Sequence, residues 1–132
     1  MMAGGFFQPP PGQPVMTTDL LAMLQRAADY AHGAGDRRTT LLLVSDMLNA
    51  TAELNMERAG GVPDPAWIAQ RQADGRVPDL RGVCVVVAGA DVSSARGVAV
   101  RDFWRAYFEA AGADFDADRY RTLIADPGAV GC

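Results

Sequence analysis

Apolar and polar residues follow a helical period in three parts of the chain. Residues 20–31 carry an apolar stripe behind the capping residues Thr17–Asp19, so a helix is predicted there. A shorter helix is predicted over 65–73, opened by an Asp-Pro pair. The widest apolar face belongs to residues 97–111, and Gly112 is suited to end that helix.

Between these segments lie three apolar runs that predict strands. Residues 39–45 and 83–88 are almost continuously apolar, which is typical of parallel strands covered on both faces. Residues 120–124 predict a short strand at an edge. The alternation of helix and strand predicts an α/β fold with three layers: a small parallel sheet of about three strands and helices on both faces.

The chain divides into one predicted domain and two flanking segments. Residues 1–16 are rich in proline and glycine and predict a poorly ordered lead-in. Residues 17–124 form the α/β domain, and residues 125–132 form a C-terminal tail. A chain of 132 residues is about the size of a single domain.

Composition narrows the classes of function. The net charge of −4 and the pI of about 4.8 argue against a nucleic-acid partner, which would require a basic patch. The sequence has no apolar run of the ~20 residues that a membrane span needs and no signal-peptide pattern, so we expect no membrane association. The two cysteines, Cys84 and Cys132, form no metal-binding motif. Cys84 is expected to act as a small buried hydrophobe in a reducing, cytoplasmic setting.

Polar side chains follow two of the predicted strands. Ser45 and Asp46 end the first strand, and Asp91, Ser93 and Ser94 come after the second. The carboxyl ends of parallel strands meet at one edge of a sheet, where α/β proteins bind their ligands. Both clusters are therefore expected at that edge. The sequence leaves open whether Asp46 instead only caps a turn with Asn49.

Several segments together resemble the von Willebrand factor A domain. Met16-Thr17-Thr18-Asp19-Leu20-Leu21 resembles the segment in which a threonine opens a helix, with Thr18 as its match. Val44-Ser45-Asp46 resembles the later Ser/Thr-Asp-Gly segment, with Met47 in place of glycine. The stretch LRGVCVVVAGAD resembles the family's fifth strand, and VRDFWRAYFEAAGA resembles the last long helix of an uncharacterised actinobacterial branch. The family's first strand and its D-x-S-x-S motif have no counterpart, so the chain resembles the C-terminal half of such a domain.

The resemblance implies a partial metal-ion-dependent adhesion site. It assigns Thr18, Asp46 and Ser45 as metal ligands for weakly bound Mg²⁺ or Mn²⁺, and it implies strands arranged in sequence order. The expected function is that of a non-enzymatic protein-interaction module with an incomplete or lost metal site. The alternative is a Rossmann-like small-molecule or nucleotide-binding protein, or an enzyme, that uses the strand-end polar cluster at Asp91, Ser93 and Ser94.

Two further expectations concern surfaces and the core. The strand at residues 39–45 would have an open apolar edge, which predicts a protein partner or self-association there. Trp104 lies in the middle of the apolar stripe of its helix and is predicted to be buried. The sequence does not decide whether Trp67 is core or an exposed anchor.

Overall fold

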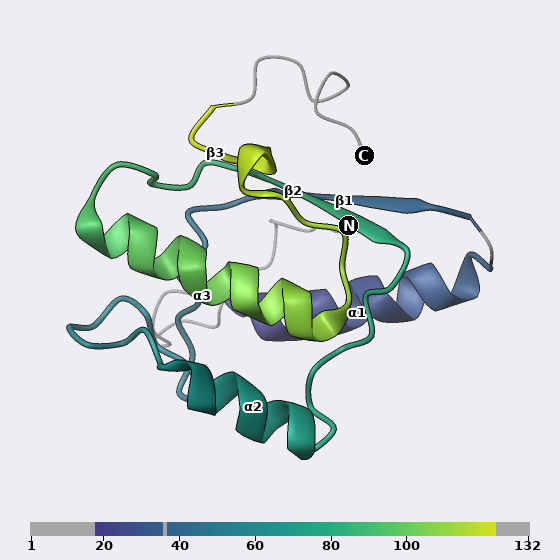
Figure 1. The fold of residues 1–132 in the computed structure, drawn as a ribbon, viewed down its shortest axis with the longest axis horizontal. Helices are drawn as coiled ribbons and strands as arrows, with labels where there is room; N and C mark the ends of the chain where they lie inside the picture. The colour runs from purple at the N-terminus through teal and green to yellow at the C-terminus, as the bar shows by residue number, and fades with distance from the viewer. Residues whose placement is uncertain (1–17, 36, 124–132) are drawn as a thin grey trace, which may run out of the picture.

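Three helices and three parallel strands alternate along the chain (Figure 1). The computed structural model describes residues 18–35 and 37–123, so the predicted lead-in and tail lie outside the described residues. The regular elements, in chain order, are α1 (Leu20–Gly33), β1 (Thr39–Val44), α2 (Pro65–Ala73), β2 (Val83–Ala88), α3 (Ala95–Ala111), a 3₁₀ turn (Ala117–Arg119) and β3 (Tyr120–Arg121).

The strands lie side by side in sequence order, β1-β2-β3, and both pairings are parallel. All six residues of β1 pair with β2, in a register that sets Leu41 opposite Val85. Only two residues of β3 pair with β2, beginning with Tyr120 opposite Val87. The predicted α/β class and the small sheet of three parallel strands are therefore confirmed.

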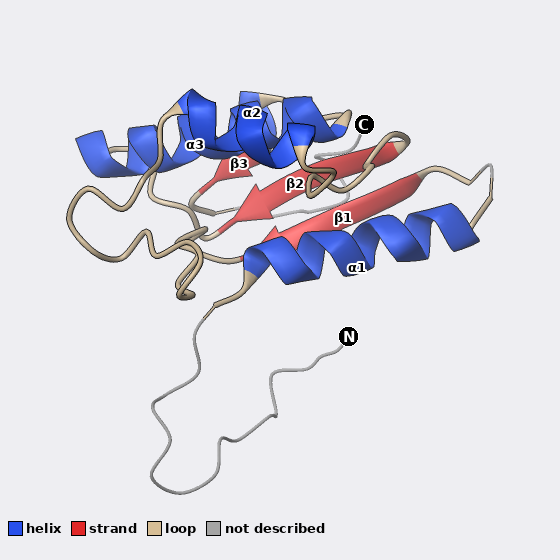
Figure 2. Ribbon diagram, turned by 90° about the horizontal axis from the view of Figure 1, so that it is seen from below, coloured by secondary structure: helices blue, strands red, loops and turns tan. Residues whose placement is uncertain are grey.

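The helices do not cover both faces of this sheet, and this corrects the prediction. Helices α1 and α3 lie against the same face, and α2 packs beneath α3 on the side away from the strands (Figures 1 and 2). The reason is the strand order. When each strand is added on the same side of the previous one through the usual right-handed crossover, the connecting helices, here α2 and α3, fall on one face. Helix α1 precedes β1 and connects no two of the described strands; its first turn is held to the loop after β1 by hydrogen bonds from the Leu20 and Leu21 N–H groups to Asn49 Oδ1.

The uncovered face shows most clearly on β1. Leu43 points into the core and is 3% exposed, whereas Leu42 is 42% and Val44 is 77% exposed. The expectation that residues 39–45 are buried on both faces is therefore wrong, although it holds for β2. Cys84 of β2 is buried as expected, but it is disulfide-bonded, which corrects its interpretation as a simple small hydrophobe.

Local chemistry fixes the helix ends. The Asp19 carboxylate accepts a hydrogen bond from the Ala22 N–H at 3.0 Å and caps α1. Helix α3 begins at Ala95, two residues before the predicted start, because the Ser94 hydroxyl accepts from the Gly97 N–H at 2.9 Å. Gly112 ends α3 with a φ of 78°, in the left-handed region that favours glycine.

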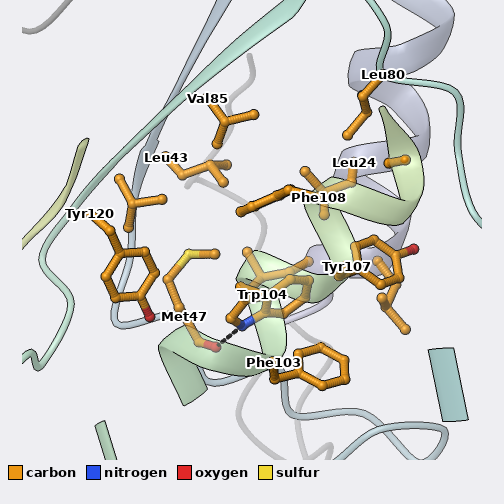
Figure 3. Close-up of a cluster of buried hydrophobic side chains, with 14 of the residues drawn as sticks. Leu24, Leu43, Met47, Leu80, Val85, Phe103, Trp104, Tyr107, Phe108 and Tyr120 are labelled. Carbon is orange, nitrogen blue, oxygen red and sulfur yellow. Dashed lines mark hydrogen bonds between the residues drawn. The ribbon is translucent and has the colours of Figure 1, made fainter. Parts of the chain in front are cut away.

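Aromatic side chains of α3 fill the space between the helices and the sheet (Figure 3). Trp104 is fully buried, as predicted, and the rings of Phe103 and Tyr107 both pack edge-on to it while stacking on each other. Trp67 of α2 is half-buried and its ring lies 5.7 Å from that of Phe103, so it belongs to the margin of the core. In the part of the chain that the structure describes, every helix is too short or too polar to cross a membrane.

Candidate functional site at the carboxyl edge of the sheet

The ends of the three strands are joined by backbone hydrogen bonds at one edge. The Ser45 N–H donates to the Ala88 carbonyl at 2.8 Å, and the Gly89 N–H donates to the Thr122 carbonyl at 3.0 Å. Gly89 has a φ of 98°, and a Cβ there would lie 3.1 Å from the Ser45 carbonyl oxygen. This close approach brings the segment that follows β2 beside the segment that follows β1, so Ser45 and Asp91 share one edge of the sheet, as the parallel topology predicts.

Ser45 and Asp46 form a tight turn with the residues that follow them. The Met47 N–H donates to Ser45 Oγ at 2.9 Å, and the Leu48 N–H donates to Asp46 Oδ1 at 3.0 Å. Asp46 therefore caps a turn, the role that the sequence left open. Among the described residues its second carboxylate oxygen accepts no hydrogen bond, and the side chain is exposed.

Met47 has a backbone conformation that favours glycine. Its φ is 65°, and within the described residues it is the sole non-glycine residue with a positive φ. The side chain is fully buried, and the carbonyl oxygen accepts a hydrogen bond from Trp104 Nε1 at 2.8 Å (Figure 3). Core packing thus offsets the cost of the left-handed conformation.

The second polar cluster caps helix α3. Asp91 Oδ1 accepts from the N–H groups of Ser93 and Ser94 at 2.9 and 3.2 Å, and Asp91 Oδ2 accepts from the Ser94 hydroxyl. These hydrogen bonds, the one from Ser94 above all, lower the pKa of Asp91 to about 2. A Cβ on Gly97 would lie 2.5 Å from the Asp91 carbonyl oxygen, so the glycine lets the first turn of α3 pack closely on this loop. Both carboxylate oxygens of Asp91 are therefore used in hydrogen bonds within the domain.

Asn49, which the sequence indicated only as a turn residue beside Asp46, has a helix-capping role that the sequence analysis missed. It is the one fully buried polar side chain among the residues described. Its Oδ1 accepts from the N–H groups of Leu20 and Leu21 at 2.7 and 3.3 Å, and its Nδ2 donates to the Leu54 carbonyl at 2.8 Å. Asn49 therefore caps α1 from the loop after β1. The sequence signal for this role is weak, because an asparagine in a loop after a strand is also a common turn former.

Thr18 lies where α1 meets this same loop. Its carbonyl accepts from the Ala50 N–H at 2.8 Å, so the start of α1 and the segment after β1 are tied together. The carboxylates do not gather: among residues 18–35 and 37–123, no three His, Cys, Asp or Glu side chains form a group that could hold a metal ion. Of the three predicted ligands, Ser45 and Asp46 are neighbours in the turn after β1, and Thr18 is tied to the same loop through Ala50.

The phenol of Tyr120 lies near the same edge and does not act as a base. Burial raises the pKa of Tyr120 to about 12, and the negative charges of Asp46 and Asp91 add to the rise. Arg101 opposes this effect without cancelling it. The hydroxyl therefore stays protonated at neutral pH.

Comparison of the chain with protein-family models, with curated proteins and with solved structures finds no match. The chemical character of this edge therefore follows from the side chains that it contains. It has one exposed carboxylate with a free oxygen, one carboxylate used as a helix cap, and one buried amide that joins two elements.

Proposed function

We propose that this protein is a non-enzymatic protein-interaction module of the von Willebrand factor A type, with an incomplete or lost metal-ion-dependent adhesion site. The proposal rests chiefly on the outer edge of β1, which presents unpaired backbone groups beside exposed apolar side chains. Such an edge favours pairing with another polypeptide.

The hydrogen-bond pattern identifies the unpaired groups. The N–H groups of Thr39 and Ser45 donate to β2, at the Gly82 and Ala88 carbonyls. Neighbouring residues of a strand direct their backbone groups to opposite sides, so Thr40, Leu42 and Val44 direct theirs away from β2. Within the described part of the chain, none of these three residues hydrogen-bonds on that side.

Two local features of the structure support the resemblance to von Willebrand factor A domains. Thr18 precedes a helix that is tied to the loop after β1, as the resemblance implies for a shared site. Met47 stands in the motif position of a glycine and has a φ of 65°, a conformation that glycine adopts readily. A backbone conformation suited to the motif's usual glycine is thus present at Met47, which supports the resemblance.

The alternative of a Rossmann-like binding protein or enzyme has less support. Its polar cluster at Asp91, Ser93 and Ser94 is used to cap α3, so the carboxylate oxygens have little capacity left for a ligand. The nearby phenol of Tyr120 is protonated at neutral pH.

A weak cation site is the first testable part of the proposal. Asp46, with the hydroxyls of Ser45 and Thr18, offers Mg²⁺ or Mn²⁺ a single carboxylate, which fits only weak binding of a hard cation. We expect a Kd on the order of 1 mM, as for sites of low charge. Calorimetric titration should detect it in the native chain and in Asp29→Ala, and should lose it in Asp46→Ala. Micromolar affinity that survives Asp46→Ala would place the ion elsewhere.

The docking edge can be tested by amide hydrogen exchange. In the dilute purified chain, the amides of Thr40, Leu42 and Val44 should exchange much faster than those of Leu41 and Leu43, which face β2. When the labelled chain is placed in an extract of cells that encode it, these three amides should become protected. Protection confined to another surface of the domain would contradict the proposed function.

A further inference from the structure

We infer that the outer edge of β1, together with one flank of α1, is a seat for a single extended strand donated by another protein. The donated strand is apolar at alternate positions, so that its inward side chains cover α1. This inference rests on the proposed interaction function and specifies the partner.

The first half of the seat is the β1 edge, formed by Thr40, Leu42 and Val44. Their outward N–H and C=O groups repeat at every second residue, which is the spacing a neighbouring strand needs for a ladder. The Leu42 and Val44 side chains, 42% and 77% exposed, rise on the uncovered face and would pack against cross-strand neighbours.

The second half is the outer flank of α1, formed by Met23, Ala27 and Tyr30. These residues follow each other at helical spacing on one side of the buried stripe. Met23 is 43% and Tyr30 is 73% exposed, which leaves apolar surface uncovered. On the other side of the stripe, His32 lies 3.2 Å from the Asp79 carbonyl, in the segment leading to β2. The Met23 flank therefore faces away from β2.

The position of α1 decides what can occupy the seat. Helix α1 lies alongside β1 on the side away from β2 (Figure 2). A strand added beside β1 would therefore lie over the Met23 flank and bury it. A second copy that paired its own β1 there with its helices on the same face would bring its own α1 into the space that α1 already fills. The seat thus accommodates one strand without an attached helix layer.

Charges at the two ends define the donated strand further. Arg37 and Arg38 precede β1, and Asp46 follows it, all with exposed side chains. Arg38 is paired with Asp114 at 2.5 Å but is still 62% exposed, so it can also contact a second carboxylate. A complementary strand carries an acidic residue at the arginine end and a basic residue at the Asp46 end, which sets its position along the edge.

The probe is a short synthetic peptide of alternating valine and threonine, with glutamate at its amino end and lysine at its carboxyl end. Added to the full-length chain, it should protect the amides of Thr40, Leu42 and Val44 from exchange. Tyr30→Lys should weaken its affinity by roughly fivefold or more, while Asp29→Lys on the same helix should leave it unchanged. Leu42→Pro removes one outward N–H that the sheet itself does not use, and should have a similar effect.

Circular dichroism and thermal melting establish that the variants are folded before their affinities are compared. Absence of protection at millimolar peptide would overturn the inference, and so would equal affinities of Tyr30→Lys and Asp29→Lys. Protection that grows with the concentration of the chain alone would identify a second copy as the occupant and also overturn it. If cell extract protects these three amides but the peptide does not, the proposed interaction function is supported and the inference of a donated strand is overturned.

Discussion

Replacing Trp104 with alanine should lower the free energy of unfolding by roughly 3–5 kcal/mol, as is usual for truncating a large buried aromatic side chain. Trp104 is fully buried, and its ring packs within 5.8 Å of three aromatic neighbours on α3, Phe103, Tyr107 and Phe108. Because domains of this size are stable by only about 5–15 kcal/mol, the variant should be close to unfolding. Urea titration followed by circular dichroism measures the change.

Two further variants bracket this effect. Trp104→Phe keeps one aromatic ring but removes the pyrrole part of the indole with its N–H, and the loss of the donor to the Met47 carbonyl should by itself cost about 1–3 kcal/mol. Arg105→Ala changes the exposed neighbouring position on α3 and should stay within about 0.5 kcal/mol of the native chain. If Trp104→Ala cost as little as Arg105→Ala, the indole would have to lie outside the core.

Replacing Asn49 with leucine should cost roughly 3 kcal/mol or more, although the two side chains have the same branched shape. The substitution leaves the Leu20 and Leu21 N–H groups and the Leu54 carbonyl without their buried partner. Each buried group left unpaired costs about 1–3 kcal/mol. The unpaired donors lie at the start of α1, so this helix should lose protection from hydrogen exchange first.

Asn55→Leu is the matched control, because the same change is made in the same loop. Asn55 Oδ1 accepts one exposed hydrogen bond, from the Glu57 N–H at 3.1 Å, so its loss should cost less than about 1 kcal/mol. Equal effects of the two substitutions in urea titrations would contradict the capping role of Asn49. A large loss for Asn49→Leu with α1 still protected would place the damage in the loop instead.

The elements that the sequence predicted well are those with strong local signals. Helix α2 begins and ends where expected because Asp64 caps it through the Ala66 N–H at 2.9 Å and Pro65 occupies its first turn. Strand β2 matches its apolar run, and α3 ends at a glycine as predicted. Strand β3 is shorter than predicted, since pairing stops at Arg121 and the last residue of the expected strand lies outside the described residues.

The candidate site was predictable in its location but not in its chemistry. The predicted strand ends indicated the carboxyl edge of the sheet, because parallel strands finish on the same side of a sheet. Whether a carboxylate there is free or used depends on loop geometry. Asp91 and Asp46 look alike in sequence, yet Asp91 has both oxygens engaged and Asp46 keeps one. The metal site, the interaction partner and the relationship to von Willebrand factor A domains remain predictions.

The sequence by itself determined the α/β class, the three helices and the buried β2, because caps, glycines and apolar periods act within a few neighbouring residues. Only the tertiary structure decided which side of β1 is covered. An apolar run such as residues 39–44 carries no periodic sign of an exposed face, so Leu42 and Leu43 look equivalent until the helices are placed. Placement depends on strand order and crossover hand, which are properties of the whole chain. They put α2 and α3 on one side of the sheet, where α1 also lies, and left the outer edge of β1 open.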